Sequence, residues 1–265
     1  MKKLKILLMI IFCFSLLGIA ANVFAVDLAG KELDITLTQS YVSRYIWRGQ
    51  DLYGQNDPAL QPSVDLTAPE LFLNTDLGIN IWGSFPLNAG HQDAEELDYT
   101  LSFSRDILDD AFSICAGYTY FDYPNSNQRA DVQEPWLSVT LNRIPLLPIE
   151  ISANVFAGYD FQAASGGPDE GWYYSWGFST QVPLPKYIFT QQEQTLSLGL
   201  TNWGNDGVAD LEPCGLYASE FSISTSYNFA NFSITPSFNY TLNHEDQINN
   251  GDDEIWAGIA VSRAF

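Results

Sequence analysis

Strict alternation of apolar and polar side chains is the feature of this sequence that most restricts its fold. In "NFSITPSFNYTLN", residues 231–243, every second residue from Phe232 to Leu242 is apolar or aromatic, and Asn, Ser or Thr stands between them. A period of two is that of an extended strand, whose side chains point alternately to opposite faces. Such a strand separates an apolar environment from a watery one.

Runs of this kind recur along most of the chain and predict twelve strands. Most have the length of about 9–11 residues that a tilted strand needs to cross a bilayer. The number is even, as closed single-chain outer-membrane barrels require. The predicted strands are 33–46, 59–68, 71–83, 97–105, 111–121, 134–142, 149–161, 171–182, 194–203, 215–229, 231–243 and 254–265.

The connections between these runs alternate in length. On one side they are long, polar and acidic, as in "WRGQDLYGQNDP" and "NHEDQINNGDD", whereas on the other side "APE" and "FAN" are short. Long extracellular loops and short periplasmic turns are typical of outer-membrane barrels. A soluble β-sandwich also alternates, but it does not account for this asymmetry. The sequence therefore predicts an all-β fold, a single transmembrane antiparallel up-and-down β-barrel of about 12 strands, over residues 26–265.

The first residues predict export. Three lysines precede the apolar run "ILLMIIFCFSLLGIA", and Val23-Phe24-Ala25 fits the cleavage pattern of a Sec signal peptide, which predicts that residues 1–25 are removed. The signal holds three of the 11 basic residues and none of the 32 acidic ones, so 8 basic residues remain and the formal charge becomes −24. Such acidity repels phosphates and excludes nucleic acid as an expected partner. The predicted location is the bacterial outer membrane.

Aromatic residues at the strand ends are predicted to form girdles where hydrocarbon meets headgroups, in contact with outer-membrane lipid and lipopolysaccharide. The last run ends on Phe265, with Ile255 to Val261 alternating on the same face, and resembles the signal read by the barrel assembly machinery; Arg263 differs from the usual residue there. The predicted outer girdle is Tyr41, Tyr45, Tyr118, Tyr120, Tyr159, Trp172, Tyr174 and Tyr240. The predicted inner girdle is Phe112, Tyr227, Phe229, Phe232 and Phe265.

The inward faces of the predicted strands are acidic. Arg44 is the basic residue expected among them, and Arg48 is expected near the outer mouth. Rings of carboxylates favour cations over anions, which suggests a narrow, weakly cation-selective pore for small polar solutes. The alternative is that the carboxylates only keep the lumen solvated. The predicted inward acids are Asp34, Asp65, Asp76, Asp98, Glu150, Asp160, Glu220 and Glu254.

Seven bulky rings are also predicted to point inward. In a narrow barrel they would either jam the lumen, as in a non-conducting adhesin, structural or docking barrel, or serve as stacking platforms for a solute. The sequence leaves both interpretations open. The rings are Phe72, Trp82, Phe121, Trp136, Phe156, Tyr173 and Trp256.

Several motifs in the first half of the mature chain resemble one family. "SRYIWRGQ" and "DPALQPSVDL" are followed by "INIWGS", "EELDYTLSFS" and "AGYTYFDYP". Together, over residues 41–124, they resemble the TorF-type porins of proteobacteria. The resemblance implies an outer-membrane channel of uncharacterised substrate, and it implies no catalytic residue.

The evidence for an enzyme or a metal site is slight. His91 and His244 are the only histidines, and neither stands in the His-x-Ser pattern of barrel phospholipases and deacylases. "HED" does place acids beside a histidine, so a barrel hydrolase is kept as an alternative. The acidic loops "QAASGGPDEG" and "NHEDQINNGDDE" lack the ligand spacing of an EF-hand and are interpreted as solvated. No catalytic residue, metal or cofactor is predicted.

Overall fold

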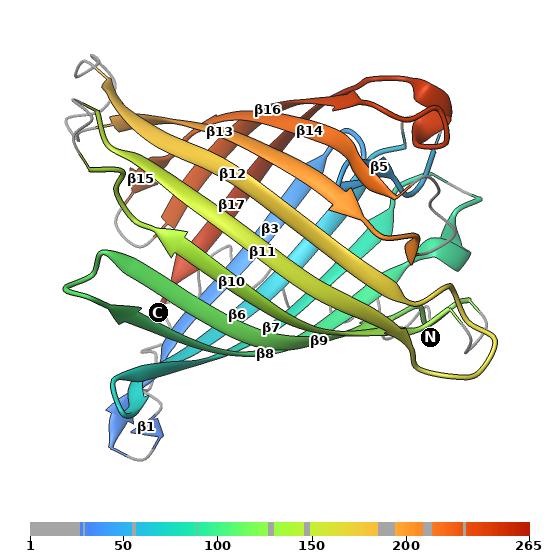
Figure 1. The fold of residues 1–265 in the computed structure, drawn as a ribbon. Coiled ribbons are helices and arrows are strands. Elements are labelled where there is room, and N and C mark those ends of the chain that lie inside the picture. Colours follow the sequence, from blue (N-terminus) through green and yellow to red (C-terminus); the bar gives the residue numbers. More distant parts are fainter. Residues whose placement is uncertain are drawn as a thin grey trace.

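The chain forms a closed antiparallel β-barrel of twelve strands (Figure 1). The computed structural model describes residues 27–28, 30–54, 57–88, 90–126, 130–145, 149–184, 194–208, 214–229 and 232–265. The predicted signal peptide and most of the turn around residues 185–193 lie outside these residues. The barrel strands are β3 (Asp34–Val42), β6 (Ala59–Phe72), β7 (Thr75–Pro86), β8 (Glu96–Ile107), β9 (Phe112–Asp122), β10 (Val132–Leu141), β11 (Ile151–Gln162), β12 (Gly171–Leu184), β13 (Gln194–Asn205), β14 (Gly215–Thr225), β16 (Phe232–Asn243) and β17 (Glu254–Ala264).

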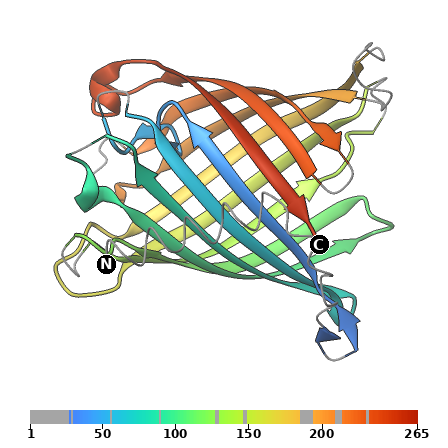
Figure 2. The ribbon, with the colours of Figure 1, turned by 180° about the vertical axis from the view of Figure 1, so that it is seen from behind.

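Each barrel strand pairs with its neighbours in the chain, and β3 pairs with β17 to close the cylinder. Figure 2 shows these two strands side by side. The short β15 (Tyr227–Phe229) continues along β16 after a break at Ser226. The remaining elements are the pairs β1 (Asp27–Leu28) with β2 (Lys31–Glu32) and β4 (Ile46–Trp47) with β5 (Gln50–Asp51), and the 3-10 turns η1 (Gln92–Ala94) and η3 (Asn249–Gly251).

No helix among the described residues is long and apolar enough to cross a membrane.

The register assigns the two faces of the sheet. Ile79 lies opposite Leu101, which lies opposite Tyr118, so these three side chains share one face of β7, β8 and β9. This face holds most of the large apolar side chains that are exposed, such as Ile79 at 42% and Val155 at 54%. The other face carries mainly Ser, Thr, Asn, Gly and carboxylates. The alternation in the sequence therefore separates an apolar outer wall from a polar interior, as predicted for an outer-membrane barrel.

The loops differ between the two ends of the barrel. The segments that follow β3, β7, β9, β11 and β16 at one end are long, whereas the turns after β6 and β8 at the other end are short. In Figure 1, η3 and β5 lie at the long-loop end, and β1 lies at the opposite end. We call these the outer and the inner end, following the usual orientation of such barrels.

The prediction for the first strand is wrong at its end. β3 stops at Val42 rather than continuing to residue 46. The Ser43 amide makes a last bond to β17, at 2.8 Å from the Ala257 carbonyl, and the chain then bends into the barrel. Tyr45 therefore does not join the outer girdle. It lies inside the barrel and is only 3% exposed.

Phe72 does not point into the lumen. The β6–β7 register shifts between Ala68 and Phe72, so that the simple alternation of faces is lost there. The ring lies at the short turn and is 71% exposed. The other predicted inward rings lie on strands without a shift at those positions.

Arg263 lies on the apolar face but is shielded by aromatic rings. Its guanidinium lies 4.6 Å from the centroid of the Phe265 ring and 5.1 Å from that of Phe232, its cross-strand partner. Stacking on ring faces is favourable for a guanidinium. The departure from the assembly-signal pattern is thus accommodated structurally, and the role of Phe265 as that signal stays a prediction.

Candidate functional site: a loop folded into the barrel

The loop after β3 folds into the barrel at its outer end, and its described residues 43–54 are called the inserted loop here. Within it, β4 and β5 form a hairpin whose two turn residues are Arg48 (φ 49°) and Gly49 (φ 84°). Positive φ at both positions is the geometry of a type I′ turn. Arginine in this left-handed region costs roughly 1–2 kcal/mol, so contacts of its side chain must compensate.

The guanidinium of Arg48 is held by Glu134 of β10. Their atoms approach at 2.6 Å (Nη1 to Oε2) and 2.8 Å (Nη2 to Oε1), and the side chains are 8% and 2% exposed. Gly158 on β11 makes room for Glu134, since a Cβ there would lie 2.5 Å from the carboxyl group. Burial disfavours the charged guanidinium, but the Glu134 carboxylate outweighs it, so the pKa of Arg48 lies above its ordinary value. The ion pair therefore attaches the inserted loop to β10.

Aromatic rings surround the same guanidinium. Its central carbon lies 4.2 Å from the ring centroid of Trp47, 4.6 Å from Tyr173, 5.1 Å from Phe156 and 5.7 Å from Trp203. Each contact within about 6 Å attracts the cation, most strongly where water is excluded. Arg48 thus joins the inserted loop to β10, β11, β12 and β13.

The tip of the hairpin presses against the opposite wall. The Tyr217 hydroxyl donates to the Arg48 carbonyl at 2.8 Å, and the Asn249 amide donates to the Gly49 carbonyl at 2.9 Å. Asn249 also accepts from the Asp51 amide at 2.8 Å. A Cβ on Gly49 would lie 2.5 Å from that of Ala218. Glycine is required here both for its left-handed backbone and for this close approach.

The base of the inserted loop contacts β7 and β8. The Tyr45 hydroxyl donates to Glu96 Oε2 at 2.6 Å, and the Tyr53 hydroxyl donates to Ser84 Oγ at 2.8 Å. Burial raises the pKa of Tyr45, and the Glu96 and Asp98 carboxyls raise it further, so the phenol remains a neutral donor. Since the loop reaches β7, β8, β10, β12 and β14, it crosses the lumen.

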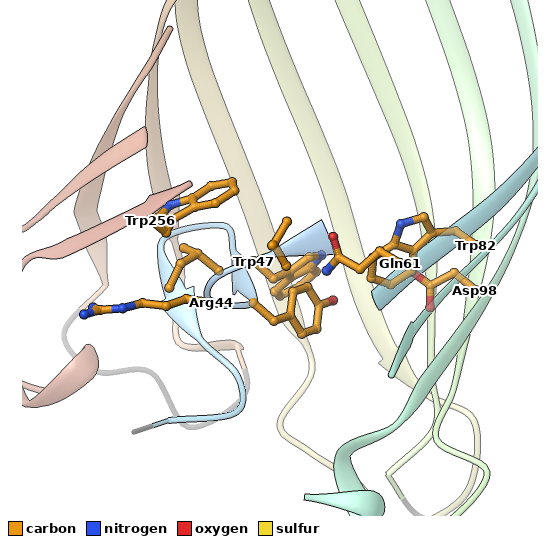
Figure 3. Close-up of a pocket in the computed structure, with 9 residues that line it drawn as sticks. Arg44, Trp47, Gln61, Trp82, Asp98 and Trp256 are labelled. Atoms are coloured by element: carbon orange, nitrogen blue, oxygen red, sulfur yellow. The ribbon is translucent and has the colours of Figure 1, made fainter. Parts of the chain in front are cut away.

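Two cavities flank the inserted loop. The inner cavity, about 230 Å³, lies on the side of the bore; Figure 3 shows Trp47 between Trp82 and Trp256, with Arg44 directed away from Asp98. The outer cavity, about 300 Å³, lies against β9 to β12 and includes Tyr123, Asp160 and Tyr173. The inner cavity is lined by Val42, Arg44, Tyr45, Ile46, Trp47, Gln61, Trp82, Asp98 and Trp256.

Beyond the inserted loop, the inner half of the barrel is lined by small polar groups that bond across the strands. Thr38 and Ser262 hydroxyls lie 2.9 Å apart, and the Asn154 amide donates to Ser138 and Thr140 at 2.8 Å. We call this region the polar bore.

The predicted inward acids fall into two groups. Asp98, Asp160 and Glu254 lie beside the inserted loop, and Arg44 forms an ion pair with Glu254. Glu220 lies in the middle of β14.

The second group lies further inward. Asp65 accepts hydrogen bonds from Ser63 and Asn80, Asp76 accepts from the Glu70 amide, and Asp34 is exposed. Glu150 lies at the inner rim, where its side chain is 77% exposed and pairs with Arg143 at 3.4 Å.

The predicted rings Trp82 and Trp256 line the inner cavity. Trp136 and Phe156 pack together at 6.1 Å between centroids, and Phe121 and Tyr173 pack edge-on against Trp47 at 5.8 and 5.3 Å.

Sequence reasoning missed Glu96, Glu134 and Trp203. Glu96 and Glu134 share the alternation of Asp98 and Trp136, which were selected, and Trp203 shares that of Thr201 on the inward face of β13. Parity alone would therefore have found them. The inward position of Arg48 had no such signal.

Within the described ranges, no group of three or more His, Cys, Asp or Glu side chains is arranged to hold a metal ion.

No protein-family model and no curated protein matches this sequence. Solved structures do match its fold. LpxR from Salmonella typhimurium has a TM-score of 0.54 at 10% identity, covering 87% of this chain and 100% of its own. The COG4313 outer membrane channel from Pseudomonas putida F1 has a TM-score of 0.50 at 10% identity, covering 94% and 100%. A KdgM porin has a TM-score of 0.49 at 10% identity, covering 87% and 99%.

At this identity the likeness establishes the fold alone. The chain has the fold of outer-membrane β-barrels, the class to which porins and channels among these structures belong.

Proposed function

We propose that this protein is a Sec-exported, porin-like channel of the bacterial outer membrane. It allows passive diffusion of small polar or cationic solutes through a narrow acidic lumen, and the inserted loop restricts its outer end. The carrying observation is the charge of the interior. Among the described strands, inward positions hold carboxylates and no Lys or Arg. The two cations that the inserted loop adds, Arg44 and Arg48, are each paired with a glutamate.

Two further observations support the proposal. The resemblance to the TorF-type porins, over residues 41–124, covers the inserted loop and strands β6 to β9. The likeness to a solved outer membrane channel covers 94% of this chain. Neither identifies a solute, so the preference for cations rests on the field of the lumen carboxylates.

Ion selectivity in planar bilayers tests the proposal. Purified, refolded protein is placed in a KCl gradient, and the reversal potential is measured beside a variant in which Ile46–Asp51 is replaced by Gly-Gly. The Leu52 amide already donates to the Tyr45 carbonyl at 3.0 Å, so the two ends meet and the graft is short. We expect K⁺ to be preferred over Cl⁻. Anion preference, or no conductance in either protein, contradicts the proposal.

The main alternative is a non-conducting structural, adhesive or docking barrel, which is favoured by the inserted loop across the lumen. The loop-shortened variant separates the two functions. If the native protein is silent and the variant conducts, the loop is a permanent seal and the native barrel is not a passive pore. Conductance of the native protein excludes this alternative.

A second candidate function, a lipid-facing hydrolase, is favoured by one contact. Ser219 Oγ lies 2.9 Å from His244 Nε2 and donates to Asn202 Oδ1 at 2.7 Å. Asn202 lies opposite Trp176 and Ser219, on the apolar outer face of the barrel. A serine beside a histidine is the minimum for nucleophilic catalysis, but the single hydroxyl proton points to Asn202, so His244 acts as the base only once the hydroxyl turns towards it.

A fluorophosphonate probe tests this candidate. Labelling that is lost in both Ser219→Ala and His244→Ala, together with release of fatty acid from vesicles, would support hydrolysis. Absence of labelling would remove it. The channel proposal assigns no catalytic residue and is unaffected by either result.

A further inference from the structure

The inner cavity is bounded mainly by aromatic rings. Trp47, Trp82 and Trp256 contribute their side chains, Tyr45 packs against Trp82 with 5.6 Å between centroids, and the volume is about 230 Å³. Figure 3 shows Trp82 and Asp98 at one end and Trp256 at the other. A cavity of this kind suits a small solute that presents a face or a cation to aromatic rings.

One carboxylate oxygen in this cavity lacks a partner. Asp98 Oδ1 is buried without a hydrogen bond. The neighbouring Glu96 does not share this condition, because its two oxygens accept from Tyr45 at 2.6 Å and from Tyr123 at 3.0 Å. A buried, unpaired carboxylate oxygen is costly unless a donor satisfies it.

The nearby cations of the described chain are already engaged. Arg44 pairs with Glu254, and Arg48 pairs with Glu134. Next to Asp98 the cavity therefore offers a donor two neighbouring carboxyl groups, those of Asp98 and Glu96, and no free arginine among the described residues. This disfavours an anionic solute and favours one that brings a positive donor.

The cavity also holds an unpaired donor. Trp256 Nε1–H is buried with no acceptor. A ligand that satisfies both ends of the cavity carries a protonated nitrogen for Asp98 and an oxygen acceptor for Trp256. Its hydrocarbon linker would contact the rings between them.

We infer that the inner cavity binds small organic amines that carry a hydroxyl or carbonyl oxygen, with Asp98 accepting from the ammonium group and Trp256 donating to the oxygen. This inference names the solute class of the proposed channel. It rests on the proposed channel function, because a solute would reach the cavity through the bore. The inserted loop contributes Tyr45 and Trp47 to the site. The inserted loop therefore forms part of the binding site.

Intrinsic tryptophan fluorescence tests the site without any measurement of transport, because three of its walls are indole rings. The full chain in detergent is titrated with ethanolamine, with neutral ethylene glycol and with anionic glycolate, at constant ionic strength. These three solutes share a two-carbon skeleton and differ in charge. We expect a saturable change with ethanolamine and none with the other two.

Asp98→Asn keeps the shape of the side chain and removes its charge. It should weaken ethanolamine binding by about tenfold or more, the loss expected for a charge-assisted hydrogen bond. Asp65→Asn is the matched control, since Asp65 is inward but already accepts from Ser63 and Asn80. It should bind as the native protein does. Trp256→Phe keeps a ring, removes the donor and should weaken binding severalfold.

The outcomes separate the two proposals. No saturable response to ethanolamine, an equal response to ethylene glycol, or unchanged binding in both Asp98→Asn and Trp256→Phe overturns the site. Cation-selective conductance without ethanolamine binding overturns the site and leaves the channel. Binding without conductance leaves the site and removes the channel. Heat-modifiable migration on gels confirms that each variant is folded.

Discussion

The outer and inner halves of the barrel interior are built from the same strands but filled in different ways. In the outer half, the inserted loop brings Arg48, Tyr45 and Trp47 into contact with large rings and carboxylates of the wall. In the inner half, hydroxyl and amide groups such as those of Thr38 and Asn154 bond across neighbouring strands. The sheet thus forms a polar lumen. The inserted loop narrows this lumen at the outer end and brings aromatic and charged side chains into it.

Removing the constriction should have the largest effect. Replacing Ile46–Asp51 by Gly-Gly takes out Arg48 and Trp47 together, and single-channel conductance should rise severalfold because the loop no longer crosses the lumen. Single-channel recording measures it. Removal of residues 164–167, from the loop between β11 and β12, is the control and should leave conductance nearly unchanged. Equal conductance of the two shortened proteins would place the constriction elsewhere.

Glu134→Gln should destabilise the outer half next most strongly. It leaves the Arg48 guanidinium buried without its counter-charge, and breaking a buried pair in this way costs about 3–5 kcal/mol. The loop can leave the wall and expose Arg48 to water, which limits the loss of stability. We therefore expect more frequent channel openings in single-channel records and a lower urea concentration at the midpoint of unfolding.

The double variant Arg48→Asn/Glu134→Gln should recover much of this stability, since neither charge of the pair then remains buried and asparagine tolerates the left-handed turn. Glu220→Gln, at another inward carboxylate, is the control for loss of charge alone. Additive effects in the double variant would show that the ion pair does not hold the loop.

Gly49→Ala should have a smaller effect that is specific to the tip of the loop. The new Cβ would lie 2.5 Å from that of Ala218, whereas at Gly54, which also has positive φ (64°), nothing lies within 4 Å of a Cβ. Both alanines suffer similar backbone strain, so the difference isolates the contact. We expect Gly49→Ala to be less stable than Gly54→Ala by about 1–3 kcal/mol. Urea unfolding measures both, and equal stabilities would mean that the tip is not pressed against β14.

Thr38→Val should have the smallest effect, because it alters only the polar lining of the inner half. It removes the bond to Ser262, whose net contribution is about 0.5–1.5 kcal/mol. Conductance should be unchanged while the midpoint of urea unfolding falls slightly. A large change in conductance would show that the inner half also limits the flow.

The sequence predicted the barrel well because the strands depend on a local pattern. Lipid on one side and water on the other impose a period of two on each strand separately, so each can be recognised without knowing its neighbours. The two wrong predictions of side-chain direction arose where the alternation continued beyond the strand or where the strand register shifted. Tyr45 kept the alternation beyond the end of β3, and Phe72 follows a register shift.

The site could be predicted only in part. Trp82, Asp98 and Trp256 lie on strands, and their inward direction follows from parity. The inserted loop is polar and looks like any extracellular loop, and its position depends on partners far along the chain. Asn249 and Tyr217, which hold its tip, are 200 and 169 residues from Gly49 and Arg48. No periodicity carries such information.

The pairing of β3 with β17 has a consequence for biogenesis. Tyr41 meets Ile259 across this seam, so the first and last barrel strands can pair only after nearly the whole chain has been synthesised. Contacts of such high sequence separation form slowly. A truncated product that lacks β17 would expose two unpaired strand edges, each a template for aggregation with other chains.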